Sequence, residues 1–113
     1  MAQLADRTCV PCRGGVPPME REQAQHLLSQ LGEGWELREN RYLFLEKTYR
    51  FKDFAQALAF VDRVGALAEE QAHHPDIHLS WGRATVSIWT HKIKGLTESD
   101  FVFAAKCDRA SST

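Results

Sequence analysis

The chain has 113 residues, of which 43% are hydrophobic and 26% charged, and its formal net charge is -1 at pH 7. These values are typical of one globular domain, and the lack of a basic excess argues against a nucleic-acid-binding protein. No apolar run approaches the roughly 20 residues that cross a bilayer, and residues 1–9 lack the apolar block of a secretory signal. We therefore expect a single cytoplasmic domain that binds neither nucleic acid nor a membrane.

The stretch before residue 19 is rich in glycine and proline and contains a C-x-x-C pair, Cys9 and Cys12. A zinc site needs four ligands, and the remaining cysteine, Cys107, lies far away in a helix-like segment. Three cysteines are also too few for a disulfide framework, which agrees with a reducing compartment. We expect residues 1–18 to be an irregular amino-terminal arm and residues 19–110 to be the domain, with a metal or redox role for the pair as the lesser alternative.

The first part of the domain predicts a helix followed by a hairpin. Residues 19–31 have apolar or small residues at the i, i+3, i+4, i+7 spacing of an amphipathic helix, and glycines follow directly. Residues 35–51 alternate in hydrophobicity and predict two antiparallel strands joined near Glu39-Asn40.

A long helix is predicted next. Asp53 with Gln56 three residues later is a capping-box pattern, in which side chains satisfy the free N–H groups of a helix start. Apolar residues then keep helical spacing from Phe54 to Ala68, which predicts a helix that covers one face of a sheet. Pro75 marks the latest position at which this helix ends.

Residues 76–81 and 84–91 alternate again and predict a second hairpin with Gly82 in its turn. In the second of these strands one face carries Ala84, Val86, Ile88 and Thr90, and the other carries Thr85, Ser87, Trp89 and His91. Thr97 with Asp100 is another capping pattern, ahead of a final helix. The order α-β-β-α-β-β-α predicts an α+β fold, a four-stranded antiparallel sheet with helices packed on one face.

Four of the five histidines lie between residues 73 and 91. His73 and His74 stand where the long helix ends, and the negative end of a helix dipole stabilises an imidazolium. His91 ends a strand beside Trp89, which suits a pocket with an aromatic wall for a planar ligand. Imidazole titrates near neutral pH, so the three fit acid-base catalysis. The alternative is that they are solvated histidines at a helix end and a strand end.

Other chemistry is less well supported. His73, His74, His78, His91 and Asp76 are candidate metal ligands, but adjacent residues of an extended chain point to opposite sides, and no helical H-x-x-x-H pattern occurs. Cys107 has no neighbouring base in sequence, and nucleophile-elbow and phosphate-loop motifs are absent. We therefore rank a metal site below metal-free acid-base catalysis.

Residues 68–75, Ala-Glu-Glu-Gln-Ala-His-His-Pro, are followed by Thr90-His91 and by Gly95-Leu96-Thr97-x-x-Asp100. This arrangement resembles the pterin-4a-carbinolamine dehydratase family, with a third histidine 17 positions after His74 and an acid nine residues later. Gly34-Trp35 and residues 51–54 are similar to other recurring segments of the family, so the resemblance spans residues 20–108. It implies helices on one face of a four-stranded antiparallel sheet.

The resemblance also implies a reaction. Such dehydratases remove water from the 4a-hydroxytetrahydropterin left by aromatic amino-acid hydroxylases, giving quinonoid dihydropterin for tetrahydropterin recycling, without a metal or organic cofactor. By position, His73 and His91 are similar to the acid-base residues at the hydroxyl, and His74 to a substrate-binding or second proton-transfer residue. The supporting residues implied are Asp100, Trp35 and Glu69. Asp100 equally suits a helix cap, and Trp35 equally suits core packing.

The family often has an acidic or amide residue before His-His-Pro, where this chain has Ala72, so an orienting hydrogen bond from that side chain is missing. Family resemblance further implies a homodimer or homotetramer, with a pterin substrate and a hydroxylase in the same pathway. It includes a coactivator or assembly role that does not need the histidines. Action on another pterin is the remaining alternative.

Overall fold

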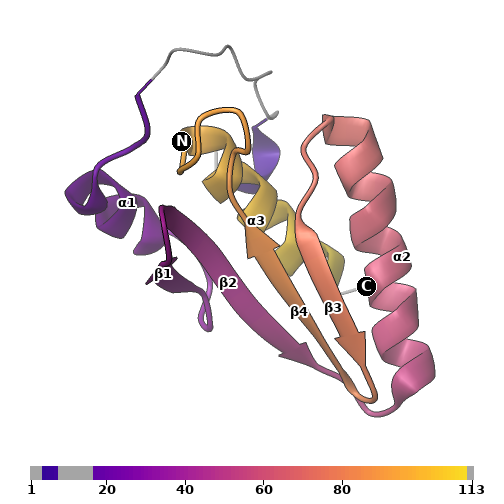
Figure 1. Cartoon of the computed structure of the whole chain (residues 1–113). Helices are drawn as coiled ribbons and strands as arrows, with labels where there is room; N and C mark the ends of the chain where they lie inside the picture. Colours follow the sequence, from indigo (N-terminus) through magenta and orange to yellow (C-terminus); the bar gives the residue numbers. More distant parts are fainter. Residues whose placement is uncertain (1–3, 8–16, 112–113) are drawn as a thin grey trace.

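The computed structural model of the chain describes residues 4–7 and 17–111. Its strands form one antiparallel sheet in the order β1-β2-β4-β3 (Figure 1). Their bounds are Glu36–Glu39 for β1, Leu43–Arg50 for β2, Asp76–Ser80 for β3 and Arg83–Ile88 for β4. Both predicted hairpins are confirmed, and the first one turns at residues 40–42, slightly later than predicted.

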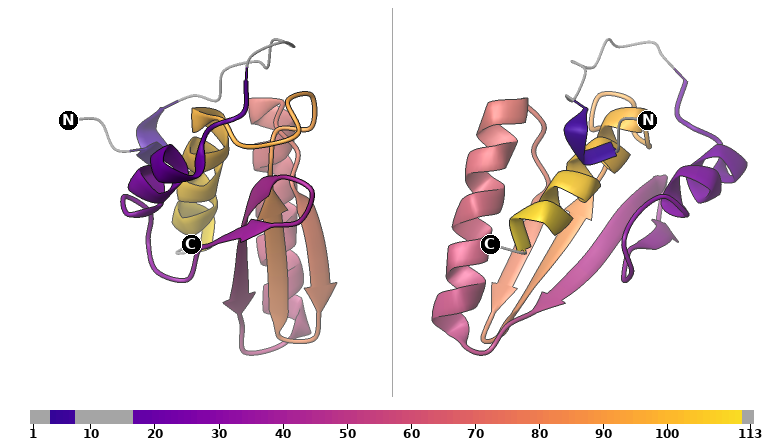
Figure 2. Two further views of the ribbon diagram at one scale, coloured as in Figure 1. Left: turned by 60° about the vertical axis from the view of Figure 1, so that its left-hand side comes forward. Right: turned by 180° about the vertical axis from the view of Figure 1, so that it is seen from behind.

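The helices cover one face of this sheet and leave the other face open (Figure 2). They are α1 (Arg21–Leu28), α2 (Phe54–Gln71) and α3 (Glu98–Ser111). The Asp53 side chain caps α2 by accepting the Gln56 N–H at 2.9 Å, as predicted. Helix α1 is shorter than the spacing predicted, because a capping box between Glu20 and Gln23 starts it two residues into the expected range.

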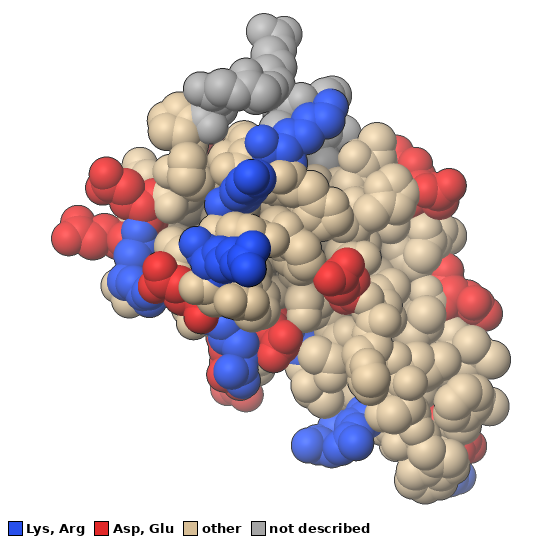
Figure 3. Space-filling model, in the orientation of Figure 1, with Lys and Arg blue, Asp and Glu red and all other residues tan. Residues whose placement is uncertain are grey.

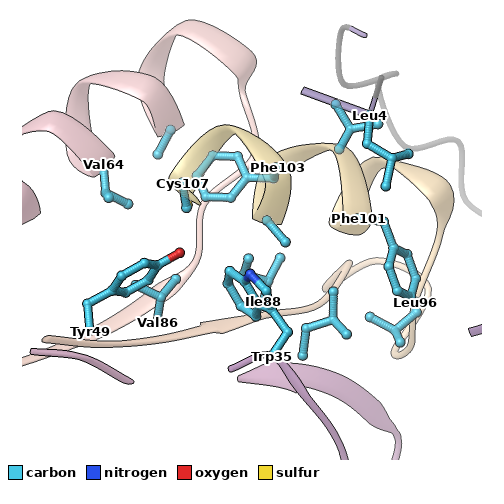
Figure 4. Packing of buried hydrophobic residues seen from close by; sticks show 14 of the residues in the cluster. Leu4, Trp35, Tyr49, Val64, Val86, Ile88, Leu96, Phe101, Phe103 and Cys107 are labelled. Carbon is cyan, nitrogen blue, oxygen red and sulfur yellow. The ribbon is translucent and has the colours of Figure 1, made fainter. Parts of the chain in front are cut away.

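The core lies between the sheet and the two longer helices (Figure 4). Strand register places Leu45 of β2 opposite Ile88 of β4, and both side chains are fully buried. The face of β4 predicted to be apolar is buried from Ala84 to Thr90 at every second residue. Phe101 and Phe103 of α3 pack onto this face, so the strand ends and the start of α3 are held together. The predicted α+β fold is thereby confirmed.

Part of the expected amino-terminal arm is packed onto α3. Leu4–Asp6 form a short 3-10 helix, η1, in which Leu4 and Ala5 are buried. The Lys106 ammonium donates to the Ala5 carbonyl at 2.9 Å, and Arg109 pairs with Asp6 at 2.9 Å. These residues are therefore ordered against the domain, because apolar side chains there cover its core. Cys9 and Cys12 lie outside the described residues. No helix within residues 4–7 and 17–111 is long and apolar enough to span a membrane.

Candidate active site

Four chain segments meet at one end of the sheet: the end of α2, the start of β3, the end of β4 and the start of α3 (Figure 1). Since β3 and β4 are antiparallel, with Asp76 opposite Ser87, the start of one strand lies beside the end of the other. His73 and His74 precede β3, and His91 follows β4. The three predicted histidines therefore leave the sheet at the same end.

Asp100 is the buried centre of this region. Its Oδ2 accepts the Thr90 hydroxyl and the Thr97 backbone N–H, each at 2.8 Å. Its Oδ1 lies 2.7 Å from Nε2 of His73, whose side chain is only 11% exposed. An ionised carboxylate can only accept hydrogen bonds, so Nε2 carries the hydrogen in this pair. The other ring nitrogen, Nδ1, is then the basic atom of His73.

The two roles considered for Asp100, a helix cap and a support for an imidazole, occur together in the structure. Oδ2 satisfies the free N–H of Thr97 at the start of α3, while Oδ1 orients His73. Thr90, which binds the same carboxylate, immediately precedes His91. One buried side chain thus connects the segments that carry two of the predicted catalytic histidines.

His74 differs from His73 because its carboxylate partner is exposed to solvent rather than buried. Its Nε2 is hydrogen-bonded to the carboxylate of Glu69, one of the predicted supporting residues. The side chains are 58% and 79% exposed, so water and salt screen the pair and it contributes little to stability. The contact can orient the His74 ring toward a ligand at this end of α2.

The backbone at Ala72 directs the chain from α2 toward Asp100. Ala72 ends the helix in the left-handed conformation, with φ 52° and ψ 40°, and the His73 N–H bonds back to the Ala68 carbonyl at 3.2 Å. This conformation disfavours residues with a Cβ by about 1–2 kcal/mol. The backbone turn at Ala72 therefore directs the chain toward Asp100 without a hydrogen bond from the residue 72 side chain, and the Asp100 carboxylate then orients the His73 ring.

His91 lines a pocket of about 460 Å³ together with Arg41, Tyr42, Trp89 and Lys94. The centroids of the His91 and Trp89 rings are 4.7 Å apart, and Trp89 also lies 5.9 Å from Tyr42. The predicted aromatic wall beside His91 is therefore confirmed. The pocket is open to solvent on the uncovered face of the sheet, so a planar molecule can enter it.

Trp35 lies in the core, away from the contacts of the histidines. Its indole N–H donates to Oδ2 of Asp108 at 3.0 Å, and its ring packs edge-on against Tyr49 (Figure 4). Oδ1 of Asp108 accepts from the Lys47 ammonium at 2.8 Å and the Tyr49 hydroxyl at 2.5 Å. Burial, then this hydrogen bond, then the charges of Asp108 and Cys107, hold the pKa of Tyr49 far above its usual range.

Several residues of the region were not predicted from the sequence. Thr90 gave a usable signal, because it is the one polar residue on an otherwise apolar strand face. Arg41, Tyr42 and Lys94 gave none, because they lie at turns whose proximity depends on strand pairing. Within the described residues, no group of three or more His, Cys, Asp or Glu side chains is placed to hold a metal ion.

Comparison with known proteins decides the family. The family model described as pterin 4 alpha carbinolamine dehydratase matches residues 17–110. The chain belongs to this family. A family member from Rubrobacter xylanophilus, provisionally named pterin-4-alpha-carbinolamine dehydratase, is 57% identical over 109 residues, covering 96% of this chain and 99% of its own. A Rickettsia bellii protein with the same provisional name is 51% identical, covering 93% and 91%.

Solved structures agree with this membership of the dehydratase family. A protein described as a transcriptional coactivator/pterin dehydratase from Brucella melitensis superposes with a TM-score of 0.77 at 28% identity, covering 83% of this chain and 98% of its own. A pterin dehydratase-like protein identified as a RuBisCO assembly factor in the alpha-carboxysome gives a TM-score of 0.62 at 26% identity, covering 72% and 93%. The fold of this chain thus occurs in proteins described as enzymes and as assembly factors.

Proposed function

We propose that His73, His74 and His91 carry out the dehydration of a pterin 4a-carbinolamine at the end of the sheet where β3 starts and β4 ends. By its family the chain is a pterin-4a-carbinolamine dehydratase, a hydro-lyase that acts in pterin recycling. One observation carries the assignment of residues: the His73 ring is held on the buried carboxylate of Asp100 at 2.7 Å, beside the segment that bears His91.

The reaction needs two proton transfers. The 4a-hydroxyl leaves as water when an acid protonates it, and a base takes a proton from a ring N–H, which leaves quinonoid dihydropterin. Imidazoles suit both steps because they gain and lose protons near neutral pH. The proton given by one histidine and the proton taken by another balance, and exchange with water restores both residues.

We assign the base to His73 and the acid to His91. With Nε2–H bonded to Asp100, Nδ1 of His73 is available to accept the ring proton, and the carboxylate stabilises the imidazolium that forms. His91 is exposed in the pocket, where it can reach a hydroxyl on the flat face of a bound ring. His74, oriented by Glu69, binds the substrate from the side of α2.

The test is the rate at which the purified chain dehydrates a 4a-hydroxytetrahydropterin. We expect wild-type protein to accelerate the reaction, and His73→Ala and His91→Ala each to lower kcat by about 10²–10⁴-fold, the usual contribution of a positioned acid or base. His26→Ala is the matched control, because His26 is exposed on α1 and is not part of the site. No acceleration by the wild type, or full activity in both variants, would contradict the proposal.

A non-catalytic binding role, as a coactivator or assembly factor, is the second candidate. It is favoured by two large apolar side chains on α2, Phe54 and Leu58, which are 43% and 41% exposed. A defined partner that binds the wild type and the His73→Ala/His91→Ala double variant, but not Phe54→Ser/Leu58→Ser, would support this role. Equal binding by all three proteins would argue against it.

A further inference from the structure

The pocket beside His91 has an unusual combination of lining residues. Aromatic rings of Tyr42 and Trp89 and the imidazole of His91 form one part of it, and the basic side chains of Arg41 and Lys94 form another. The residues come from two segments, residues 40–42 between β1 and β2 and residues 89–95 after β4. A pocket of about 460 Å³ has room for a bicyclic ring together with a substituent.

The basic side chains of this pocket are not neutralised. Within residues 4–7 and 17–111, no ion pair involves Arg41, Lys94 or the neighbouring Lys92, and no carboxylate lines the pocket. Arg38 and Arg109 each pair with an acid, whereas some cations elsewhere, such as Arg50 and Lys52, also have no ion pair among the described residues. The pocket is therefore distinguished by two cations beside aromatic rings rather than by the lack of ion pairs alone. Figure 3, which faces the open side of the sheet, shows several Lys and Arg side chains close together toward the end where β4 finishes.

The backbone at Lys94 gives an independent indication. Lys94 has φ 57°, a left-handed conformation that favours glycine. The turn is fixed on both sides, because the Lys94 N–H bonds to the Thr90 carbonyl at 2.9 Å and the Thr90 N–H bonds to the Gly95 carbonyl at 2.8 Å. A lysine therefore occupies a strained position in a turn fixed by two hydrogen bonds, and this lysine lines the pocket. Strain of this kind concentrates at binding and catalytic sites.

We propose that this pocket binds the anionic substituent of a pterin, a phosphate or carboxylate carried on the side chain of the ring. Arg41 and Lys94 bind the negative group, and Tyr42 and Trp89 pack against the ring, which places the ring beside His91. The proposal rests on the proposed function and narrows its substrate class, because two cations and no described carboxylate line the pocket that holds the ring. Lys92 adds positive charge nearby and raises the local concentration of an anion.

The test is calorimetric measurement of the Kd of the full chain for three stable pterins of similar size. The probes are neutral 6-hydroxymethylpterin, its phosphate ester and 6-carboxypterin. We expect at least one anionic probe to bind about tenfold or more tightly than the neutral one at low salt, as one charge-assisted contact allows. Added salt should weaken anionic binding more than neutral binding. The tighter of the two anions identifies the group that the pocket accepts.

Variants connect any preference to the pocket. Arg41→Gln and Lys94→Gln should each reduce the anionic preference about tenfold. Lys94→Gly should do the same in a turn that glycine fits without strain, which excludes misfolding as the cause. Lys52→Gln, which removes an exposed charge at the start of α2, is the matched control and should keep the preference. Equal affinity for neutral and anionic probes, or a preference unchanged in the Arg41 and Lys94 variants, would overturn the proposal.

Failure of this proposal can be told apart from failure of the dehydratase assignment, because the probes are not turned over. His73→Ala is expected to lose activity yet to keep the anionic preference, since Arg41 and Lys94 make the proposed contacts to the negative group. A chain that dehydrates a carbinolamine but shows no preference contradicts the anion site alone. A chain with the preference but no dehydration contradicts the catalytic assignment alone.

Discussion

Helix α3 carries two aspartates about two turns apart, and each collects hydrogen bonds from distant parts of the chain. Asp100 is fully buried and binds Thr90, Thr97 and His73. Asp108 is partly buried and binds Trp35, Lys47 and Tyr49. Two residues of the same type on one helix thus organise two clusters with different partners.

The partners determine what each cluster can do. The Asp100 cluster contains an imidazole, a group that can accept and donate a proton, so that cluster can take part in proton transfer. Burial, followed by the hydrogen bond to Asp108, holds the pKa of Tyr49 far above its usual range, and the ammonium of Lys47 supplies the counter-charge to Asp108. We propose that the Asp100 cluster serves the reaction and that the Asp108 cluster serves stability. Three predictions test this division and a fourth tests the helix end that leads to His73, starting with the largest expected effect.

Asp100→Asn should lower kcat about 10–100-fold, as is typical when a group that orients a reacting imidazole is lost. The amide no longer supplies two accepting oxygens, so His73 loses both its orientation and the counter-charge for its protonated form. Asp108→Asn should leave kcat within about twofold of wild type. Equal losses in the two variants would refute the division.

Asp108→Ala should lower the free energy of unfolding by about 1–3 kcal/mol or more, because three donors lose their acceptor in a partly buried site. Urea denaturation measures this loss as a lower midpoint. Asp62→Ala is the matched control, since Asp62 is an exposed acid on α2, and we expect a change within about 0.5 kcal/mol. A control as unstable as Asp108→Ala would show that the cluster adds nothing specific.

The raised pKa of Tyr49 leads us to expect a loss of stability at high pH. Burial first, then the hydrogen bond to Asp108, then nearby negative charge raise the pKa of Tyr49 in the folded chain. In the unfolded chain a tyrosine ionises near pH 10, so above about pH 10 the unfolded state binds fewer protons and stability falls as pH rises. Thermal unfolding from pH 8 to 11 should show this slope, and Tyr49→Phe should reduce it. An identical slope in the variant would contradict the assignment.

Ala72→Gly should give the smallest effect, a stabilisation of up to about 1 kcal/mol. Glycine adopts the left-handed conformation of this helix end without strain, although its unfolded chain is more flexible. Ala66→Gly, in the exposed middle of α2, should instead destabilise by roughly 1 kcal/mol. Thermal midpoints of the pair measure both signs. A destabilised Ala72→Gly would mean that the strain at this turn is negligible.

Most of the fold was predictable because hydrophobic periods report directly which side of an element is buried. The alternation from Ala84 to Thr90 and the helical spacing after Asp53 each specify a face, and packing those faces together leaves few arrangements. Element ends were less certain. Helix α1 begins at a Glu20 capping box that its apolar spacing does not reveal, and the first hairpin turns at residues that fit several turn positions.

The candidate site was predictable in part for the same reason. The histidines were found because they cluster in sequence, and Asp100 because the family resemblance and a capping pattern both marked it. The contact between His73 and Asp100 joins residues 27 positions apart, so no local pattern reports it. Trp35 illustrates the converse, because an aromatic residue beside a turn fits a ligand site or the core equally well until its partner, Asp108, is known. Arg41 and Lys94 line the same pocket because strand pairing brings their two turns together, which no local pattern reports.

The contacts of η1 with α3 join the two ends of the described chain, so they form only after the last helix has been synthesised. Synthesis delivers His73, then Thr90, and only later Asp100 and the rest of α3, and the contacts between Ala5 and Lys106 span 101 positions. The His73 ring and the Thr90 hydroxyl can therefore bond to Asp100 only after α3 has been synthesised. If translation stops before α3, the nascent chain lacks Asp100, so neither His73 nor Thr90 has its buried carboxylate partner.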